Sequence, residues 1–167
     1  MHVTSSGSAK VTLPADDQIL VTREFDAPKH LVYKAFTTPE LVRRWWHANR
    51  GEMTVAEIDL RVGGKWRYVM VADGGMEVGF HGEYREIVPN ERIVSTETFE
   101  GLPEGVSEED GTTVNTATFA ETDGRTTLTL LIQAPSRETR DAIVDSGMEA
   151  GLQDALDNLE QVAVSLD

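Results

Sequence analysis

From Glu52 to Gln133 the chain is a series of β-branched and aromatic segments separated by turn-forming residues, and this pattern most constrains the fold. The turn signals are Val62-Gly63-Gly64, Asp73-Gly74-Gly75, Pro89-Asn90 and Asp123-Gly124, all typical of hairpin connections. The segments between them predict strands over about 53–61, 65–72, 78–88, 91–100, 112–121 and 125–133. We therefore expect six antiparallel strands that form a curved sheet.

The segments on either side of this series predict one more strand and three helices. Residues 18–26 predict a strand, and Asp26 lies where it could cap a short helix that Pro28 begins. Thr38 and Pro39 predict the start of a second short helix. From about 135 to 166 an apolar stripe at helical spacing, with Ser136 as its cap, predicts one long helix. A sheet covered by such a helix is an α+β domain, which we place at 16–167 after a flexible leader at 1–15.

Composition and charge exclude several classes of function. The 167-residue chain has no cysteine, which excludes disulfides, thiol catalysis and cysteine-ligated zinc. Its net charge of −14 argues against nucleic acid and anionic membrane surfaces as partners. No apolar run is long enough to insert into a membrane, and neither a secretory signal nor metal-ligand spacing is visible. We expect a cytoplasmic protein with no metal and no cofactor.

Strand alternation separates the side chains into two faces. Trp66, Tyr68 and Met70 share one face of their strand, and Phe80 and Tyr84 share one face of the next. Charged residues occupy the opposite face, so we expect the aromatic set to face the long helix. We expect a cavity there, with ligand-binding residues Trp46, Trp66, Tyr68, Met70, Phe80, Tyr84, Phe99, Met148 and Leu152.

Two features of this predicted cavity allow alternative interpretations. Gly147 and Gly151 lie one turn apart in the predicted helix, where glycine allows either close packing on the sheet or space for a ligand. Trp45, beside Trp46, fits the core and the pocket equally well.

The ionisable residues do not form a recognisable catalytic set. His47 lies in a loop that could border a cavity entrance, and His81 falls on the outward face. Neither has an obvious carboxylate partner in the sequence. Glu86 lies two residues after Tyr84, so strict strand alternation would place it on the same inward face, where it would be a candidate acid. We expect a bulge near Pro89 to turn it outward. We assign no catalytic residue.

Several motifs occur in an order that resembles a known superfamily. They are Val21-Thr22-Arg23-Glu24-Phe25-Asp26-Ala27-Pro28, Arg44-Trp45-Trp46, Val62-Gly63-Gly64-Lys65-Trp66, His81-Gly82-Glu83-Tyr84 and Ser146-Gly147-Met148-Glu149. Over about 18–164 the series resembles the SRPBCC (START-like, Bet v 1-like) superfamily, in the branch similar to the C-terminal domain of the activator of Hsp90 ATPase. The resemblance implies a helix-grip fold, in which a curved antiparallel sheet wraps around a long C-terminal helix and a hydrophobic cavity separates the two.

The resemblance also implies three classes of function. Relatives bind lipids, polyketides or other apolar molecules, some act as cyclases or hydrolases, and co-chaperone relatives stimulate the ATPase of Hsp90. We expect a small hydrophobic or aromatic ligand. The alternatives are a cyclase- or hydrolase-like enzyme that uses an inward carboxylate or His47, and a co-chaperone-type interaction domain that uses the exposed sheet face or the acidic loop at 101–111. An Hsp90-type chaperone is the weaker candidate partner, and a homodimer stays open.

Overall fold

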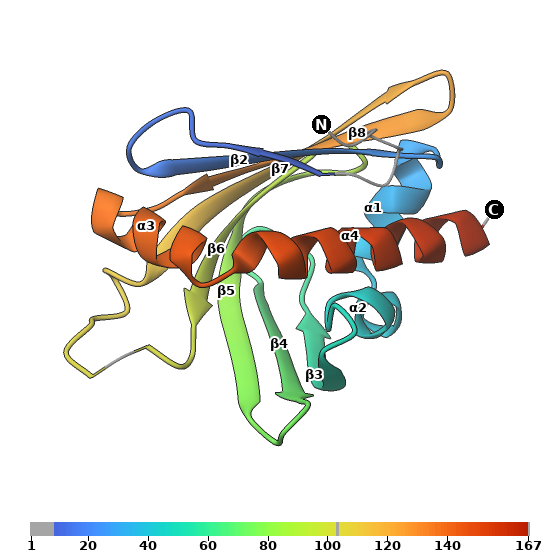
Figure 1. Cartoon of the computed structure of the whole chain (residues 1–167). Helices are drawn as coiled ribbons and strands as arrows, with labels where there is room; N and C mark the ends of the chain where they lie inside the picture. Colours follow the sequence, from blue (N-terminus) through green and yellow to red (C-terminus); the bar gives the residue numbers. More distant parts are fainter. Residues whose placement is uncertain (1–8, 103, 167) are drawn as a thin grey trace.

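The computed structural model describes residues 9–102 and 104–166, and an antiparallel sheet dominates it (Figure 1). Its strands are Lys10–Thr12 (β1), Gln18–Phe25 (β2), Gly51–Ile58 (β3), Lys65–Ala72 (β4), Glu77–Val88 (β5), Arg92–Phe99 (β6), Thr112–Thr122 (β7) and Arg125–Gln133 (β8). Within the described ranges these eight strands pair in the order β1-β2-β8-β7-β6-β5-β4-β3. Strands β3 to β8 pair in chain order, as their hairpin turns predict.

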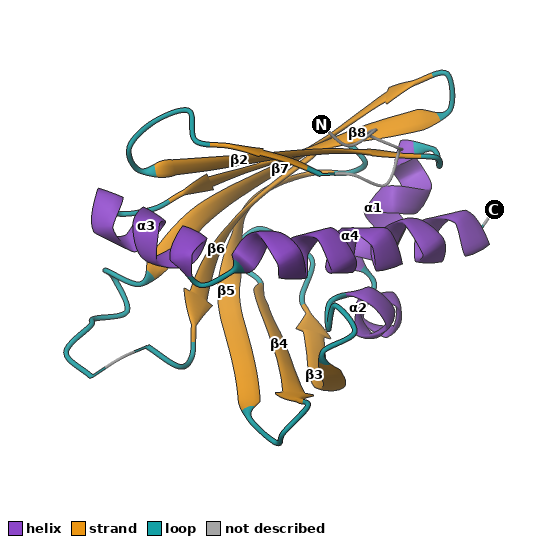
Figure 2. Ribbon diagram, viewed as in Figure 1, coloured by secondary structure: helices purple, strands orange, loops and turns teal. Residues whose placement is uncertain are grey.

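Four helices occur within the same described ranges (Figure 2): α1 (Lys29–Thr37), α2 (Pro39–Trp45), α3 (Arg137–Asp145) and α4 (Met148–Ser165). Helices α1 and α2 join β2 to β3. Helix α4 runs across the concave side of the curved sheet (Figure 1), which is the predicted helix-grip arrangement. We call this side of the sheet the inner face and the opposite side the outer face.

A buried ion cluster attaches α4 to the inner face. Arg23 of β2 is 1% exposed, and its guanidinium lies 2.9 Å from Asp157 Oδ1 and 2.9 Å from Glu160 Oε1 of α4. The other oxygen of Glu160 accepts a hydrogen bond from the backbone N–H of Asp26. A charge without water is costly unless it is paired, so these contacts determine where α4 crosses β2.

The single long helix predicted for about 135–166 is wrong, because it is interrupted at Gly147. The chain leaves α3 after Asp145, and Gly147 adopts φ +84°, a left-handed conformation that glycine tolerates best. Gly147 is thus a turn residue between two helices and not an interior position of one. Ser136 caps α3 as predicted, with its hydroxyl accepting a hydrogen bond from Thr139 N.

Two smaller expectations at the N-terminal side also change. Residues 1–8 of the expected leader lie outside the described residues, but Lys10–Thr12 form β1 and pair with β2. The adjacent backbone N–H of Ala9 donates to Gln153 Oε1 of α4. Pro28 and not Asp26 occupies the N-cap of α1, and no side chain caps that end.

Candidate functional site

Five of the predicted site residues form one aromatic cluster on the inner face. The ring centroids of Trp66 and Tyr68 are 4.8 Å apart, and Trp46 lies 5.6 Å from Tyr68 and 5.7 Å from Phe80. Phe80 continues the cluster to Phe99, at 5.1 Å. These residues come from β4, β5, β6 and the end of α2, so only the fold brings them together.

The other predicted site residues surround this cluster. Tyr84 is buried, whereas Met70, Met148 and Leu152 are partly buried and pack against the core. Trp45 belongs to the core, because its indole N–H donates to Ala35 O at 2.9 Å within a buried environment. Whether the predicted residues bind a ligand stays a prediction.

The two halves of α4 pack differently on the sheet. In the C-terminal half, Leu156 and Leu159 are 1% and 0% exposed. In the N-terminal half, Met148 and Leu152 keep accessible surface. Gly151 lies one turn before buried Ala155, and a Cβ built on it would meet no atom within 4 Å. Gly151 therefore leaves space beside the helix and does not serve close packing.

An acidic residue that the sequence analysis did not select lies on the inner face. Glu97 of β6 shares its face with Phe99 and pairs with Thr113 of β7. Burial raises the pKa of its carboxyl group from 4.5 to about 7. The alternation that placed Phe99 inward applies equally to Glu97 two residues earlier, so the signal was present in the sequence.

A short hydrogen-bond chain orients this carboxylate. Asn115 Nδ2 donates to Glu97 Oε1 at 3.3 Å, and Thr113 Oγ1 donates to Asn115 Oδ1 at 2.8 Å. Because a carboxylate only accepts hydrogen bonds, the amide nitrogen of Asn115 faces Glu97 and its amide oxygen faces the Thr113 hydroxyl. The result is a small polar area within an otherwise apolar inner face.

Three tyrosines add hydroxyl groups on the same face. Tyr68 and Tyr84 lie close enough for their hydroxyl groups to interact, and burial is the main cause that raises the pKa of each phenol. The buried Tyr33 hydroxyl has no hydrogen-bond partner among the described residues. Its ring packs edge-on against Phe119, at a centroid distance of 5.4 Å. The inner face thus combines aromatic surface with hydroxyl and carboxyl groups.

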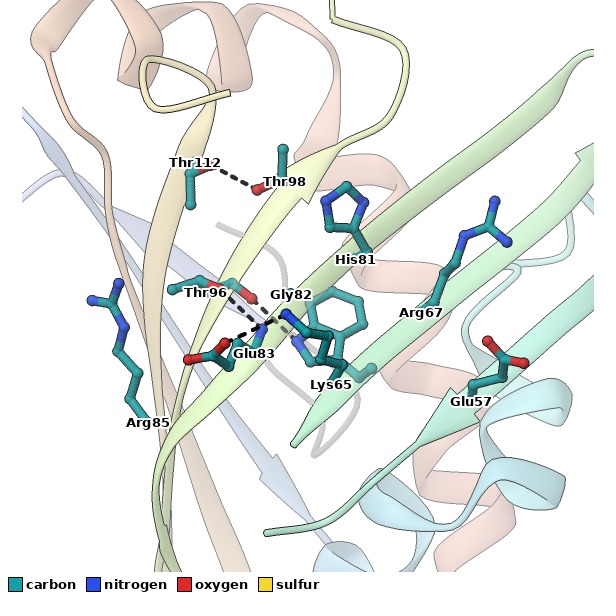
Figure 3. A pocket seen from close by; sticks show the side chains of 11 residues that line it. Glu57, Lys65, Arg67, His81, Gly82, Glu83, Arg85, Thr96, Thr98 and Thr112 are labelled. Atoms are coloured by element: carbon teal, nitrogen blue, oxygen red, sulfur yellow. Dashed lines mark hydrogen bonds and ion pairs between the residues drawn. The ribbon is translucent and has the colours of Figure 1, made fainter. Parts of the chain in front are cut away.

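A second concave region lies on the outer face of β4, β5 and β6 (Figure 3). It has a volume of about 510 Å³ and is lined by Glu57, Lys65, Trp66, Arg67, His81, Gly82, Glu83, Arg85, Thr96, Thr98 and Thr112. Trp66 alone among the predicted site residues contributes to this lining. Most of the lining side chains in Figure 3 are charged or polar, which is typical of a hydrated sheet surface.

The basic side chains of this outer pocket are largely paired with acids. Glu100 accepts two hydrogen bonds from Arg67 at 2.9 Å each and contacts His81 Nδ1 at 2.9 Å. These contacts lower the pKa of Glu100 to about 2, and the hydrogen bond from Arg67 has the largest effect. Lys65 lies 3.5 Å from Glu83. Arg85 differs from these side chains, because it forms no ion pair with an acid among the described residues.

The β5–β6 pairing is interrupted near Gly82, where the Trp66 indole reaches across β5 to β6. The Trp66 indole N–H donates to Thr96 O at 3.1 Å, and the Thr96 hydroxyl accepts from Glu83 N at 3.0 Å. A Cβ on Gly82 would lie 1.8 Å from Thr96 O and 2.6 Å from Trp66 Nε1. Glycine is required here because the indole must cross β5 to reach β6.

Two of the remaining acid–base candidates lie on the outer face of the sheet. His81 is on the outer face as predicted, although it does have a carboxylate partner, Glu100. Glu86 is exposed, as expected, and contacts Arg92 at 3.1 Å, although the register shift that turns it outward lies between Tyr84 and Glu86 and not near Pro89. His47 Nδ1 accepts the backbone N–H of Asn49.

The described residues contain neither a metal-binding cluster nor a helix that could span a membrane. Across 9–102 and 104–166 no group of three or more His, Asp or Glu side chains is placed to hold a metal ion. No helix in these ranges is long and apolar enough to cross a membrane.

Solved structures of bacterial proteins share this fold. A Rhodobacter sphaeroides protein superposes with a TM-score of 0.84 at 22% identity, over 95% of this chain and 99% of that one. A Chromobacterium violaceum protein gives 0.76 at 29% identity, over 89% and 98%. An Aeromonas hydrophila protein described as AHSA1-like gives 0.66 at 21% identity, over 88% and 93%. No curated protein sequence matches the chain.

The family comparison covers most of the sequence. The family described as "Activator of Hsp90 ATPase homolog 1-like protein" matches residues 26–163, from the end of β2 to the last turns of α4. This range includes the aromatic cluster, Glu97 and Gly151. The chain therefore belongs to the family of activator of Hsp90 ATPase homolog 1-like proteins, within the SRPBCC group of helix-grip folds.

Proposed function

We propose that this protein binds a small hydrophobic or aromatic ligand between the N-terminal half of α4 and strands β4, β5 and β6. Proteins of this fold family commonly bind hydrophobic ligands. The predicted residues Trp46, Phe80 and Phe99 supply aromatic walls, and Met148 and Leu152 supply a flexible apolar side. The closely packed C-terminal half of α4 holds the helix in place.

One observation carries this proposal: α4 covers large apolar side chains without filling the space beside them. Phe99 is 36% exposed and Phe80 keeps accessible surface, although both belong to the face that α4 crosses. Leu152 of α4 keeps accessible surface as well. At Gly151 there is room for a side chain. Apolar surface left accessible in a concave region is favourable for burying a ligand, at about 25 cal/mol per Å².

The test is a titration that compares a variant with the space filled and a matched control. The probes are 8-anilinonaphthalene-1-sulfonate, naphthalene-based alcohols and medium-chain fatty alcohols, with tryptophan fluorescence and thermal shift as readouts. Gly151→Leu places a side chain in the space. Val164→Leu introduces the same residue type on the exposed side of the same helix, where Val164 is 48% exposed, and adds only one methylene group there.

We expect saturable binding to the wild-type protein and to Val164→Leu, and binding weakened by about tenfold or more in Gly151→Leu, since a filled site cannot admit the probe. Circular dichroism establishes that both variants keep the fold. The absence of saturable binding across the whole panel would refute the proposal. Equal affinity in both variants would place the binding elsewhere.

A specific observation favours the enzyme-like alternative as a second candidate. Glu97 is a carboxyl group on the inner face whose pKa of about 7 suits general acid–base catalysis at neutral pH. Hydrolysis of apolar p-nitrophenyl esters by wild type and Glu97→Gln tests it. Turnover that disappears in the variant supports this candidate, and turnover equal in both proteins contradicts it.

A further inference from the structure

We propose that the inner-face site selects a cationic ligand, an amine with an apolar or aromatic body, whose ammonium group pairs with the Glu97 carboxylate. This inference rests on the proposed function and specifies its ligand class. It is carried by the position of one carboxylate among aromatic rings, by its incomplete set of partners and by the distribution of positive charge on the sheet.

The two carboxylate oxygens of Glu97 differ in their hydrogen-bond partners. Oε1 accepts from the Asn115 amide, which Thr113 holds in place. Among the described residues, no hydrogen bond or ion pair reaches Oε2. Protein surrounds the carboxyl group closely enough to raise its pKa, and yet the residue keeps accessible surface. Oε2 is therefore available to a ligand that enters the concave side.

Several basic side chains of the sheet pair with acids other than Glu97. Burial is the cause that raises the pKa of Glu97, with no nearby cation to oppose it. Lys65 and Arg67 of β4 and His81 of β5 lie on the outer face (Figure 3). Each of them contacts an acid, Glu83 or Glu100. Arg23, on the inner face, pairs with Asp157 and Glu160. A buried charge without a counter-ion is costly, so a cationic ligand would gain more from Glu97 than a neutral one.

Aromatic rings lie on the same face of the sheet as the Glu97 side chain. Phe99 shares the face of Glu97 two residues further along β6, and Phe80 packs against Phe99 at 5.1 Å. Trp46 continues the ring cluster at 5.7 Å from Phe80. Aromatic faces attract ammonium groups and bury apolar bodies, so both parts of an amphipathic amine find partners here. The net charge of −14 favours the approach of a cation.

The experiment uses three probes with one aromatic body: 1-naphthylmethylamine, 1-naphthalenemethanol and 1-naphthoate. Isothermal titration calorimetry at about pH 8, above the pKa of about 7, keeps Glu97 ionised in the wild-type protein. Glu97→Gln removes the charge and keeps the shape. Glu86→Gln removes an exposed carboxylate that contacts Arg92 and is the matched control.

We expect the amine to bind the wild type and Glu86→Gln about tenfold or more tightly than the alcohol, since a charged hydrogen bond is stronger than a neutral one. In Glu97→Gln the amine should lose this advantage while the alcohol keeps its affinity, which also shows that the variant is folded. An amine preference that is absent from the wild type, or that survives in Glu97→Gln, overturns the inference. If none of the three probes binds the wild type, the proposed function itself fails.

Discussion

Replacing Glu97 by glutamine should change how the stability of this protein depends on pH. In the folded protein, burial raises the pKa of Glu97 from 4.5 to about 7. Between these values the folded state holds a proton that the unfolded state has released. Raising the pH through this window therefore destabilises the wild-type fold, and above about pH 7 the full penalty is present. Glutamine does not titrate, so the variant escapes this penalty.

The magnitude follows from the size of the shift. One pKa unit corresponds to about 1.4 kcal/mol, so a rise from 4.5 to about 7 is worth about 3 kcal/mol. Partial exposure of Glu97 makes this value an upper limit. Glutamine can still accept the hydrogen bond of Asn115, so the variant keeps that contact.

The assay is urea-induced unfolding of wild type and Glu97→Gln at a series of pH values from about 4.5 to about 8. Other titrating groups are common to both proteins, so they cancel when the two unfolding free energies are subtracted. We expect this difference to shift in favour of the variant by up to about 3 kcal/mol over the series. Glu86→Gln, an exposed control, should show a shift of less than about 1 kcal/mol. A flat difference for Glu97→Gln would refute the reasoning, because it would show that burial does not disfavour the ionised carboxylate.

Three further substitutions test individual packing statements by the same unfolding assay. Gly151→Ala should raise the free energy of unfolding by about 1 kcal/mol, because its Cβ meets nothing within 4 Å and alanine favours the helix; a loss of stability would show that the space does not exist. Arg23→Met should lower it by about 3 kcal/mol, since Asp157 and Glu160 lose their buried partner; no loss would contradict the role of this cluster in attaching α4. Gly82→Ala should lower it by about 1–3 kcal/mol and shift tryptophan emission, because a Cβ would lie 1.8 Å from Thr96 O and displace the Trp66 indole; unchanged emission would argue against the indole crossing β5.

Much of the fold could be predicted because its signals are local. Turn residues separate the strands, and alternation along β4 and β5 correctly divided the aromatic from the charged side chains. The same alternation placed His81 outward, and a bulge was expected to turn Glu86 outward. The structure confirms both orientations. The error at Gly147 is also local in origin. A continuous apolar stripe does not reveal a single left-handed residue that divides it into two helices.

The candidate site depended on pairings that sequence pattern does not contain. His81 has a carboxylate partner because β6 lies beside β5 and is followed directly by Glu100, 19 residues further along the chain than His81. Glu97 was missed because a charged residue in a strand is ordinarily solvated, and only the packing of the folded chain around β6 desolvates its carboxyl group.

The sequence by itself determined the hairpin series, the family resemblance and the division of side chains between two faces, since periodicity and turn chemistry act over a few residues. Only the tertiary structure decided which face α4 covers tightly and which part of that face it leaves open. It also decided that Trp45 is core while Trp46 joins the ring cluster, and that Glu97 is the carboxylate beside those rings. Burial is a property of what packs against a residue, and that packing joins segments that are far apart in the chain.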